Sequence, residues 1–293
     1  MQLRLVKTLL WLLSILPLRL NHAIGAFIGL CNWWLPTRNR TATRVNLALC
    51  FPEATQQERR NLGRQSLIET GKAMTELGWI WHRSAKELNA KIRNVHGQTH
   101  LDLARQQKKG LIIVSPHLGS WEFCTVPLAW ENRPVFMYRP PRRPFLEPLM
   151  ISARTRFGAE LASVDAAGIK HVIRSLREGR CVGILPDQEP DRANGVFAPF
   201  FGVEANTMTL LSRLSSSAEI GLVMMYCERL PHGQGYDVHY LPADEAIRHK
   251  DKTNATRALN ASLERCILQC KHQYIWSYKR FRLQPDGSRR KYR

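Results

Sequence analysis

The segment that most constrains how this chain folds covers residues 110–122 and reads GLIIVSPHLGSWE. Its continuous apolar run is typical of a strand that is buried on both faces, and the proline after the run disfavours a helix there. We therefore expect a buried strand that ends just before His117. Gly119 permits a bend, and Ser120 is a good N-cap for a helix with Glu122 in its first turn.

His117 and Glu122 have the residue types of a proton-transfer pair. An imidazole accepts a proton near neutral pH, and a carboxylate fixes its tautomer and stabilises its charged form. The spacing alone is weak, because a carboxylate also follows three other histidines by five residues, namely His82, His232 and His239. The strand-and-turn context favours the pair at His117, and a surface histidine beside a capping acid is the alternative.

The rest of the chain alternates between strand and helix patterns. After a basic helical region from about residue 38 to 94, the expected strands are 111–115, 135–138, 181–185, 220–227 and, as an edge strand, 236–241. The expected helices are 169–178, 208–217 and 253–270. This alternation predicts an α/β fold.

Polar residues follow three of the expected strands. Ligands gather beyond the carboxyl ends of strands in such sheets, so we expect His117, Arg139 and Asp187 to share one rim. Arg154 and Arg156 add guanidinium groups suited to phosphate oxygens. Taken singly, Arg139 could be a solvated cation and Asp187 a turn residue.

The segment 196–202 reads VFAPFFG, and Phe200 and Phe201 could cover a hydrocarbon chain in a cleft. A loop plugged into the core is the alternative interpretation.

The net charge and the N-terminal sequence indicate what the chain binds. The formal net charge of +19 predicts an anionic partner. Residues 9–35 are mostly apolar, so we expect an N-terminal membrane anchor over 1–36, either a kinked span or a hairpin in one leaflet, and a catalytic domain over 37–293. The seven scattered cysteines look like reduced packing residues, so we expect the catalytic body to face a reducing cytoplasm. No metal or cofactor is expected.

At these motifs the chain resembles the late acyltransferases of lipid A biosynthesis, within the broader lysophospholipid acyltransferase group. The resemblance rests on an ordered set of motifs: 46–52, the H-x4-E box at 117–122, 138–140, 154–158, 183–188, 199–202, 273–276 and 279–282. One departure is the segment 207–211, where many relatives have a Thr followed closely by Gly.

The resemblance implies a glycerol-phosphate-acyltransferase-like mixed sheet flanked by helices, with an N-terminal membrane-anchoring helix. It implies transfer of a fatty acyl group from acyl carrier protein to a hydroxyl of a phosphorylated glucosamine disaccharide, usually bearing Kdo sugars, at the cytoplasmic face of the bacterial inner membrane. No cofactor, metal or nucleic acid is implied.

In this hypothesis His117 deprotonates the hydroxyl and Glu122 orients His117. Backbone N–H groups near Gly119, or a rim cation, would stabilise the oxyanion. Arg154 and Arg156 match the family's arginine block and would hold phosphate or developing charge, and Asp187 would fix one of them.

Other functions remain open from the sequence. The acceptor could be a lysophospholipid or an ornithine lipid. From another class, the chain could be a basic membrane-tethered protein that binds nucleic acid or acidic lipid, although it lacks RNA-binding signatures. A serine hydrolase using Ser120 would lack the usual nucleophile elbow.

Overall fold

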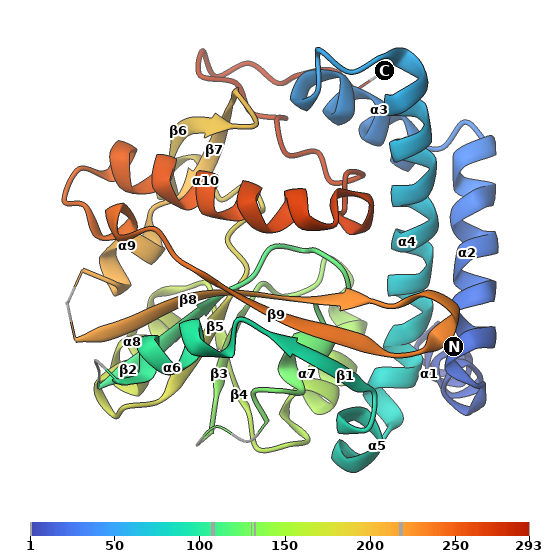
Figure 1. Cartoon of the computed structure of the whole chain (residues 1–293), viewed down its shortest axis with the longest axis horizontal. Coiled ribbons are helices and arrows are strands. Elements are labelled where there is room, and N and C mark those ends of the chain that lie inside the picture. The colour runs from blue at the N-terminus through green and yellow to red at the C-terminus, as the bar shows by residue number, and fades with distance from the viewer. Residues whose placement is uncertain (1, 107–108, 130, 132, 217–218, 293) are drawn as a thin grey trace.

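The computed structural model describes residues 2–106, 109–129, 131, 133–216 and 219–292. A seven-stranded mixed sheet with strand order β1-β9-β8-β2-β5-β3-β4 forms its centre (Figure 1). Only the β8–β9 pair is antiparallel among its pairings. The strands are β1 (Ile92–His96), β2 (Gly110–Val114), β3 (Val135–Tyr138), β4 (Glu160–Ser163), β5 (Cys181–Ile184), β8 (Ile220–Arg229) and β9 (Tyr236–Pro242). The α/β class is therefore confirmed.

Helices cover both faces of the sheet. In chain order, the helices after the N-terminal segment are α3 (Arg38–Cys50), α4 (Gln56–His82), α5 (Ala85–Asn89), α6 (Gln98–Gln106), α7 (Glu147–Thr155), α8 (Ala166–Arg177), α9 (Leu210–Leu214) and α10 (Lys252–Gln269). Alternate residues of β2 enter two cores: Ile112 packs in the cluster that contains α8 and α10, and Ile113 in the cluster that contains α4 and α6. Burial of β2 on both faces explains its unbroken apolar sequence.

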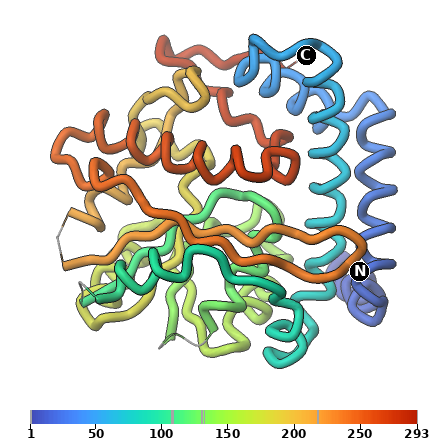
Figure 2. Tube along the Cα trace, viewed as in Figure 1, coloured from blue at the N-terminus to red at the C-terminus, as the bar shows by residue number. Residues whose placement is uncertain are grey.

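The N-terminal segment forms two helices, α1 (Gln2–Ile15) and α2 (Leu18–Trp34), which are separated at Pro17. In the described part of the chain, no helix has the length and apolar character needed to cross a membrane, so the predicted anchoring span is not supported. Both helices instead pack against α4, as Figure 2 shows. The α2–α4 contact is close because Gly25 meets Gly71 backbone to backbone, where a Cβ on Gly71 would lie 2.0 Å from the Gly25 carbonyl oxygen.

Several predicted elements agree with the structure, and others were wrong. The helix predicted at 253–270 is α10, and the strand predicted at 135–138 is β3. Strand β1 overlaps the end of the region expected to be helical, and β9 is an interior strand that pairs with both β1 and β8. The helix expected over 208–217 is the short α9, and residue 217 lies outside the described residues.

The segment expected to be an aromatic loop is a β-hairpin. It consists of β6 (Gly195–Phe200) and β7 (Val203–Met208), which pair antiparallel beside α10. The C-terminal segment packs on this hairpin, since the buried Arg280 donates to the Asn206 carbonyl oxygen at 2.6 Å.

Candidate active site

His117 lies just beyond the carboxyl end of β2 and is paired with Asp187, which follows β5. The Nδ1 atom of His117 is 2.7 Å from Asp187 Oδ1, and the His117 backbone N–H donates to Asp187 Oδ2 at 2.9 Å. The two residues meet because β2 and β5 are adjacent and parallel. Burial opposes ionisation of Asp187. The positive charge that His117 carries when protonated, together with its ring and backbone hydrogen bonds, offsets this and leaves the pKa of Asp187 below its usual value.

Gln188 contacts the other ring nitrogen of His117. Its Nε2 lies 3.2 Å from His117 Nε2. An amide NH₂ donates, so this contact requires a lone pair on His117 Nε2, whereas the carboxylate of Asp187 requires a proton on Nδ1. Both neighbours therefore select the neutral tautomer that can accept a proton at Nε2. Gln188 lay within a recognised motif but was not among the predicted site residues, because nothing in the sequence places its amide on the ring.

Glu122 is buried and paired with Arg154 of α7. Arg154 donates to Glu122 through Nε at 3.2 Å and through a second guanidinium nitrogen, and Trp81 Nε1 donates at 3.1 Å. Burial raises the pKa of Glu122, but the charge of Arg154 and these hydrogen bonds more than offset it, so the pKa lies below its usual value.

The two carboxylates, Asp187 and Glu122, have each other's expected partners. Asp187, not Glu122, is the carboxylate bonded to the His117 ring, and Glu122, not Asp187, holds an arginine. Spacing along the chain favoured the nearby acid, whereas adjacency of β2 and β5 in the sheet brings up the distant one.

The turn that carries His117 is fixed on both sides of Gly119. The Gly119 N–H donates to the Gln273 carbonyl oxygen at 3.2 Å, and the Ser120 N–H donates to the Cys227 carbonyl oxygen at 2.8 Å. The suggestion that backbone N–H groups near Gly119 stabilise an oxyanion is therefore wrong for these two groups. Ser120 caps no regular helix, since only a three-residue 3₁₀ turn, Phe123–Thr125, follows. Its side chain is buried, which disfavours it as a nucleophile.

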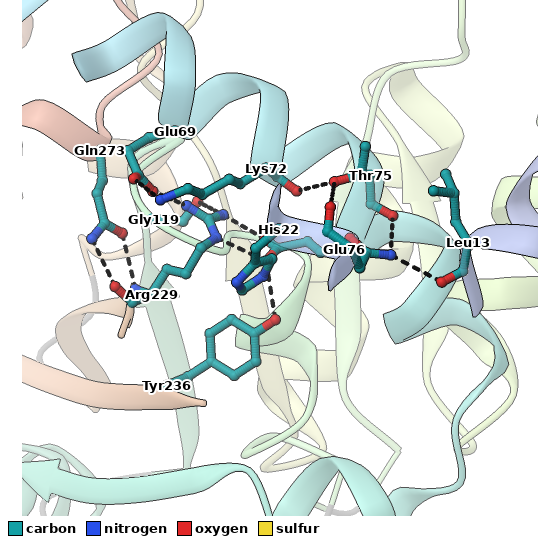
Figure 3. A network of polar contacts seen from close by, with 11 residues as sticks. Leu13, His22, Glu69, Lys72, Thr75, Glu76, Gly119, Arg229, Tyr236 and Gln273 are labelled. Carbon is teal, nitrogen blue, oxygen red and sulfur yellow. Dashed lines mark hydrogen bonds and ion pairs between the residues drawn. The ribbon is translucent and has the colours of Figure 1, made fainter. Parts of the chain in front are cut away.

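Beneath this turn lies a buried ionic network, shown in Figure 3. Arg229 at the end of β8 donates to Glu76 at 2.8 and 2.5 Å and to Glu69 at 2.9 Å. The same guanidinium donates to the Gly119 carbonyl oxygen at 3.1 Å. His22 of α2 and the Tyr236 hydroxyl also contact Glu76, each at 3.0 Å. Helices α2 and α4 are thereby joined to the turn beside His117.

A cavity of about 280 Å³ opens beside His117. Glu122, Arg154, Gln188 and the predicted Arg139 line its polar side. Its apolar side is lined by Phe136, Met137, Met150, Val164, Ile184, Leu185 and Met208. The expected convergence of His117, Arg139 and Asp187 at one rim is thus present, since Asp187 lies directly behind His117. The apolar residues were not predicted as a site, because apolar side chains on strands and helices are equally typical of core packing.

Three predicted substrate-binding residues lie elsewhere. Arg156 donates to the carbonyl oxygens of Ile80 and Arg83 at the end of α4 and does not line the cavity. Phe200 is fully buried in the core, and Phe201 packs on Phe51. Neither phenylalanine lines the cavity beside His117, in agreement with the alternative interpretation of this segment as a core plug.

One group of side chains in the described part of the chain has metal-ligand character. His96 of β1 and Asp237 and His239 of β9 present ligand atoms within 4.8 Å of one another. The group lies on strands remote in order from β3 and β5, and none of its members lines the cavity beside His117.

Comparison with known proteins identifies the family. The model of the bacterial lipid A biosynthesis acyltransferases matches residues 3–283. The chain is 28% identical over 282 residues to the lipid A biosynthesis lauroyltransferase of Escherichia coli, covering 95% of this chain and 90% of that one. It is 29% identical over 284 residues to the palmitoleoyltransferase of the same organism, with the same coverages, and 23% identical over 284 residues to its myristoyltransferase, covering 96% and 87%. The chain therefore belongs to the bacterial lipid A biosynthesis acyltransferase family and is an acyltransferase.

Proposed function

We propose that this enzyme transfers a fatty acyl group from acyl carrier protein to a hydroxyl of a phosphorylated glucosamine disaccharide of the Kdo₂-lipid IVA type. The reaction would take place at the cytoplasmic face of the inner membrane. The observation that carries the proposal is the His117–Asp187 pair. The ring nitrogen of His117 that Asp187 does not contact, Nε2, faces Gln188 at the wall of a cavity that is apolar on one side.

In the proposed reaction His117 is the general base. The acceptor hydroxyl replaces the Gln188 amide at His117 Nε2 and gives up its proton there, while Asp187 stabilises the imidazolium. The oxygen attacks the thioester carbonyl, the C–S bond breaks, and the leaving thiolate takes the proton back from His117. No acyl-enzyme forms in this scheme.

The two sides of the cavity suit the two substrates. Methionines such as Met137, Met150 and Met208 adapt to a flexible acyl chain, which favours this side as the acyl pocket. On the polar side, Arg139 lines the cavity and is exposed, and no carboxylate lies within ion-pair distance of it among the described residues. Arg139 is therefore our candidate for the cation that meets negative charge. Arg154 is already neutralised by Glu122 and acts with it as part of the wall.

The N-terminal helices supply a surface for the membrane. Large apolar side chains are exposed on α1 and α2, among them Leu5 at 71%, Phe27 at 68% and Trp34 at 67%. Exposed apolar side chains in this number on one helical pair are typical of helices that lie in the membrane interface. We propose that α1 and α2 rest on the surface of the leaflet through these side chains, an arrangement that differs from both the kinked span and the hairpin within one leaflet considered from the sequence.

The test is an acyl-transfer assay with acyl carrier protein thioesters and the purified glycolipid acceptor. His117→Ala should lower kcat by on the order of a hundredfold or more. His100→Ala, a matched change outside the cavity, should leave kcat unchanged. Mass spectrometry of lipid A from cells with and without the enzyme should show loss of one secondary acyl chain. An unaltered lipid A, or near-normal transfer by His117→Ala, would contradict the proposal.

A further inference from the structure

A second cavity lies between α3 and the start of α4 and is lined by arginines. It has a volume of about 470 Å³, and its wall includes Arg40 and Arg44 of α3 and Arg59 and Arg60 of α4. Its lining contains no aspartate or glutamate. We call this cavity the arginine groove, and none of its residues lines the cavity beside His117.

The charges of the groove are not neutralised within the protein. Among the residues that the structure describes, Arg40, Arg44 and Arg60 have no carboxylate within ion-pair distance, and Arg59 donates only to backbone carbonyl oxygens. Arg40 and Arg44 are four residues apart on one helix, so their like charges repel. The Nε atom of Arg40 is also buried without a hydrogen-bond partner. Such a set of donors is stabilised when an anion occupies the groove.

The position of the groove indicates where the anion comes from. Figure 1 shows α3 at the end of the molecule where α2 ends and α4 begins. The groove is lined by Pro36, which directly follows the exposed side chains of Trp34 and Leu35, at 67% and 57%. Tryptophan and apolar residues followed by arginines are typical of segments that lie at a membrane interface. There the aromatic rings lie at the level of the headgroups and the cations contact the phosphates.

We propose that the arginine groove binds the phosphate of an anionic phospholipid headgroup. The inference rests on the proposed docking of α1 and α2 on the leaflet and adds a headgroup site to it. Bound lipid would fix the end of α2 to α3 and orient the enzyme on the membrane, while the reaction at His117 takes place in a separate cavity.

The test compares two double variants that remove equal charge. Arg44→Gln/Arg60→Gln removes the two exposed arginines of the groove, and Arg177→Gln/Arg257→Gln removes exposed arginines of α8 and α10. Binding of the full chain is measured by flotation with vesicles of phosphatidylcholine alone or with added phosphatidylglycerol. The groove variant should bind the phosphatidylglycerol vesicles about 30-fold more weakly than the wild type, as expected for two cations lost from an anionic surface. The control variant should change little, and circular dichroism should show both folded.

The remaining measurements separate this proposal from its rivals. Acyl transfer in detergent micelles should be unchanged in the groove variant, so loss of vesicle binding would not bear on the proposed reaction. Equal weakening by both double variants would mean a general charge effect and overturn the site. If inorganic phosphate alone competed with vesicles and stabilised the protein as well, the groove would take free phosphate instead. A raised KM for the carrier-protein thioester with unchanged vesicle binding would assign the groove to the acidic donor protein.

Discussion

The Nδ1 atom of His117 lies 2.7 Å from Oδ1 of Asp187, a residue 70 positions further along the chain. A second oxygen of the same carboxylate accepts the His117 backbone N–H at 2.9 Å. Two contacts from one carboxylate fix both the ring and the start of its turn. The orientation of the imidazole is therefore set by a neighbouring strand of the sheet and not by the acid of the H-x4-E box.

Asp187→Asn should lower kcat by on the order of 10²- to 10⁴-fold. An amide in place of the carboxylate no longer stabilises the imidazolium and permits the wrong tautomer of His117. Asp191→Asn, in the exposed loop that follows, is the matched control and should retain full activity. A wild-type rate with Asp187→Asn would show that the contact does not serve catalysis.

Glu122→Gln should destabilise the fold by about 3–5 kcal/mol, because it leaves Arg154 buried without its charge partner. Replacing both residues by apolar ones, as in Glu122→Leu/Arg154→Met, should recover much of this loss. The control is Arg174→Gln, which breaks an exposed pair with Glu178 and should cost less than about 1 kcal/mol. Urea unfolding measures all three, and equal effects of Glu122→Gln and Arg174→Gln would contradict the buried-pair argument.

Gly119→Ala and Gly158→Ala should differ strongly although both glycines have positive φ, +61° and +83°. At Gly158 an added Cβ meets nothing within 4 Å, so only the backbone cost of about 1–2 kcal/mol applies. At Gly119 the Cβ would lie 2.0 Å from the Cys227 carbonyl oxygen, so the turn must move. A shift of about 1 Å at His117 should cost on the order of 100-fold in kcat. Assay and thermal unfolding of both variants check this, and comparable kcat values would refute it.

The free energy of unfolding should depend on pH through the titration of Glu76. Burial opposes its ionisation, but Arg229 and His22 hold its pKa well below the ordinary 4.5. A carboxyl with a depressed pKa stabilises the fold at pH values above the ordinary pKa, and this contribution is lost as the pH falls toward the folded-state pKa. The free-energy difference between wild type and Glu76→Gln should therefore be largest near neutrality and shrink below about pH 4.5. Urea unfolding across this pH range tests the prediction. The control is Glu53→Gln at an exposed position, whose difference from the wild type should not change with pH. A difference independent of pH would contradict this titration.

The sequence by itself determined the strands and helices with strong periodicity and singled out His117 as the candidate base. The unbroken apolar run of β2, followed by a proline, predicted a strand buried on both faces, and His117 at its end could be recognised from that context. The ordered motifs likewise predicted the family that the comparison confirms. Elements with little apolar character, such as the largely exposed β1, gave no such signal.

Only the tertiary structure decided which side chains meet. Asp187 reaches His117 because β5 lies beside β2 in the sheet, and strand order is not encoded in local sequence. The same holds for Arg156, which holds the end of α4, and for Phe200, which fills the core. It holds also for the N-terminal helices, whose apolar sequence predicted an anchor. In the fold one face of these helices packs on α4 and the other stays exposed. The hydrophobic effect favours covering apolar side chains but is non-directional, so it does not specify which part of the chain covers them.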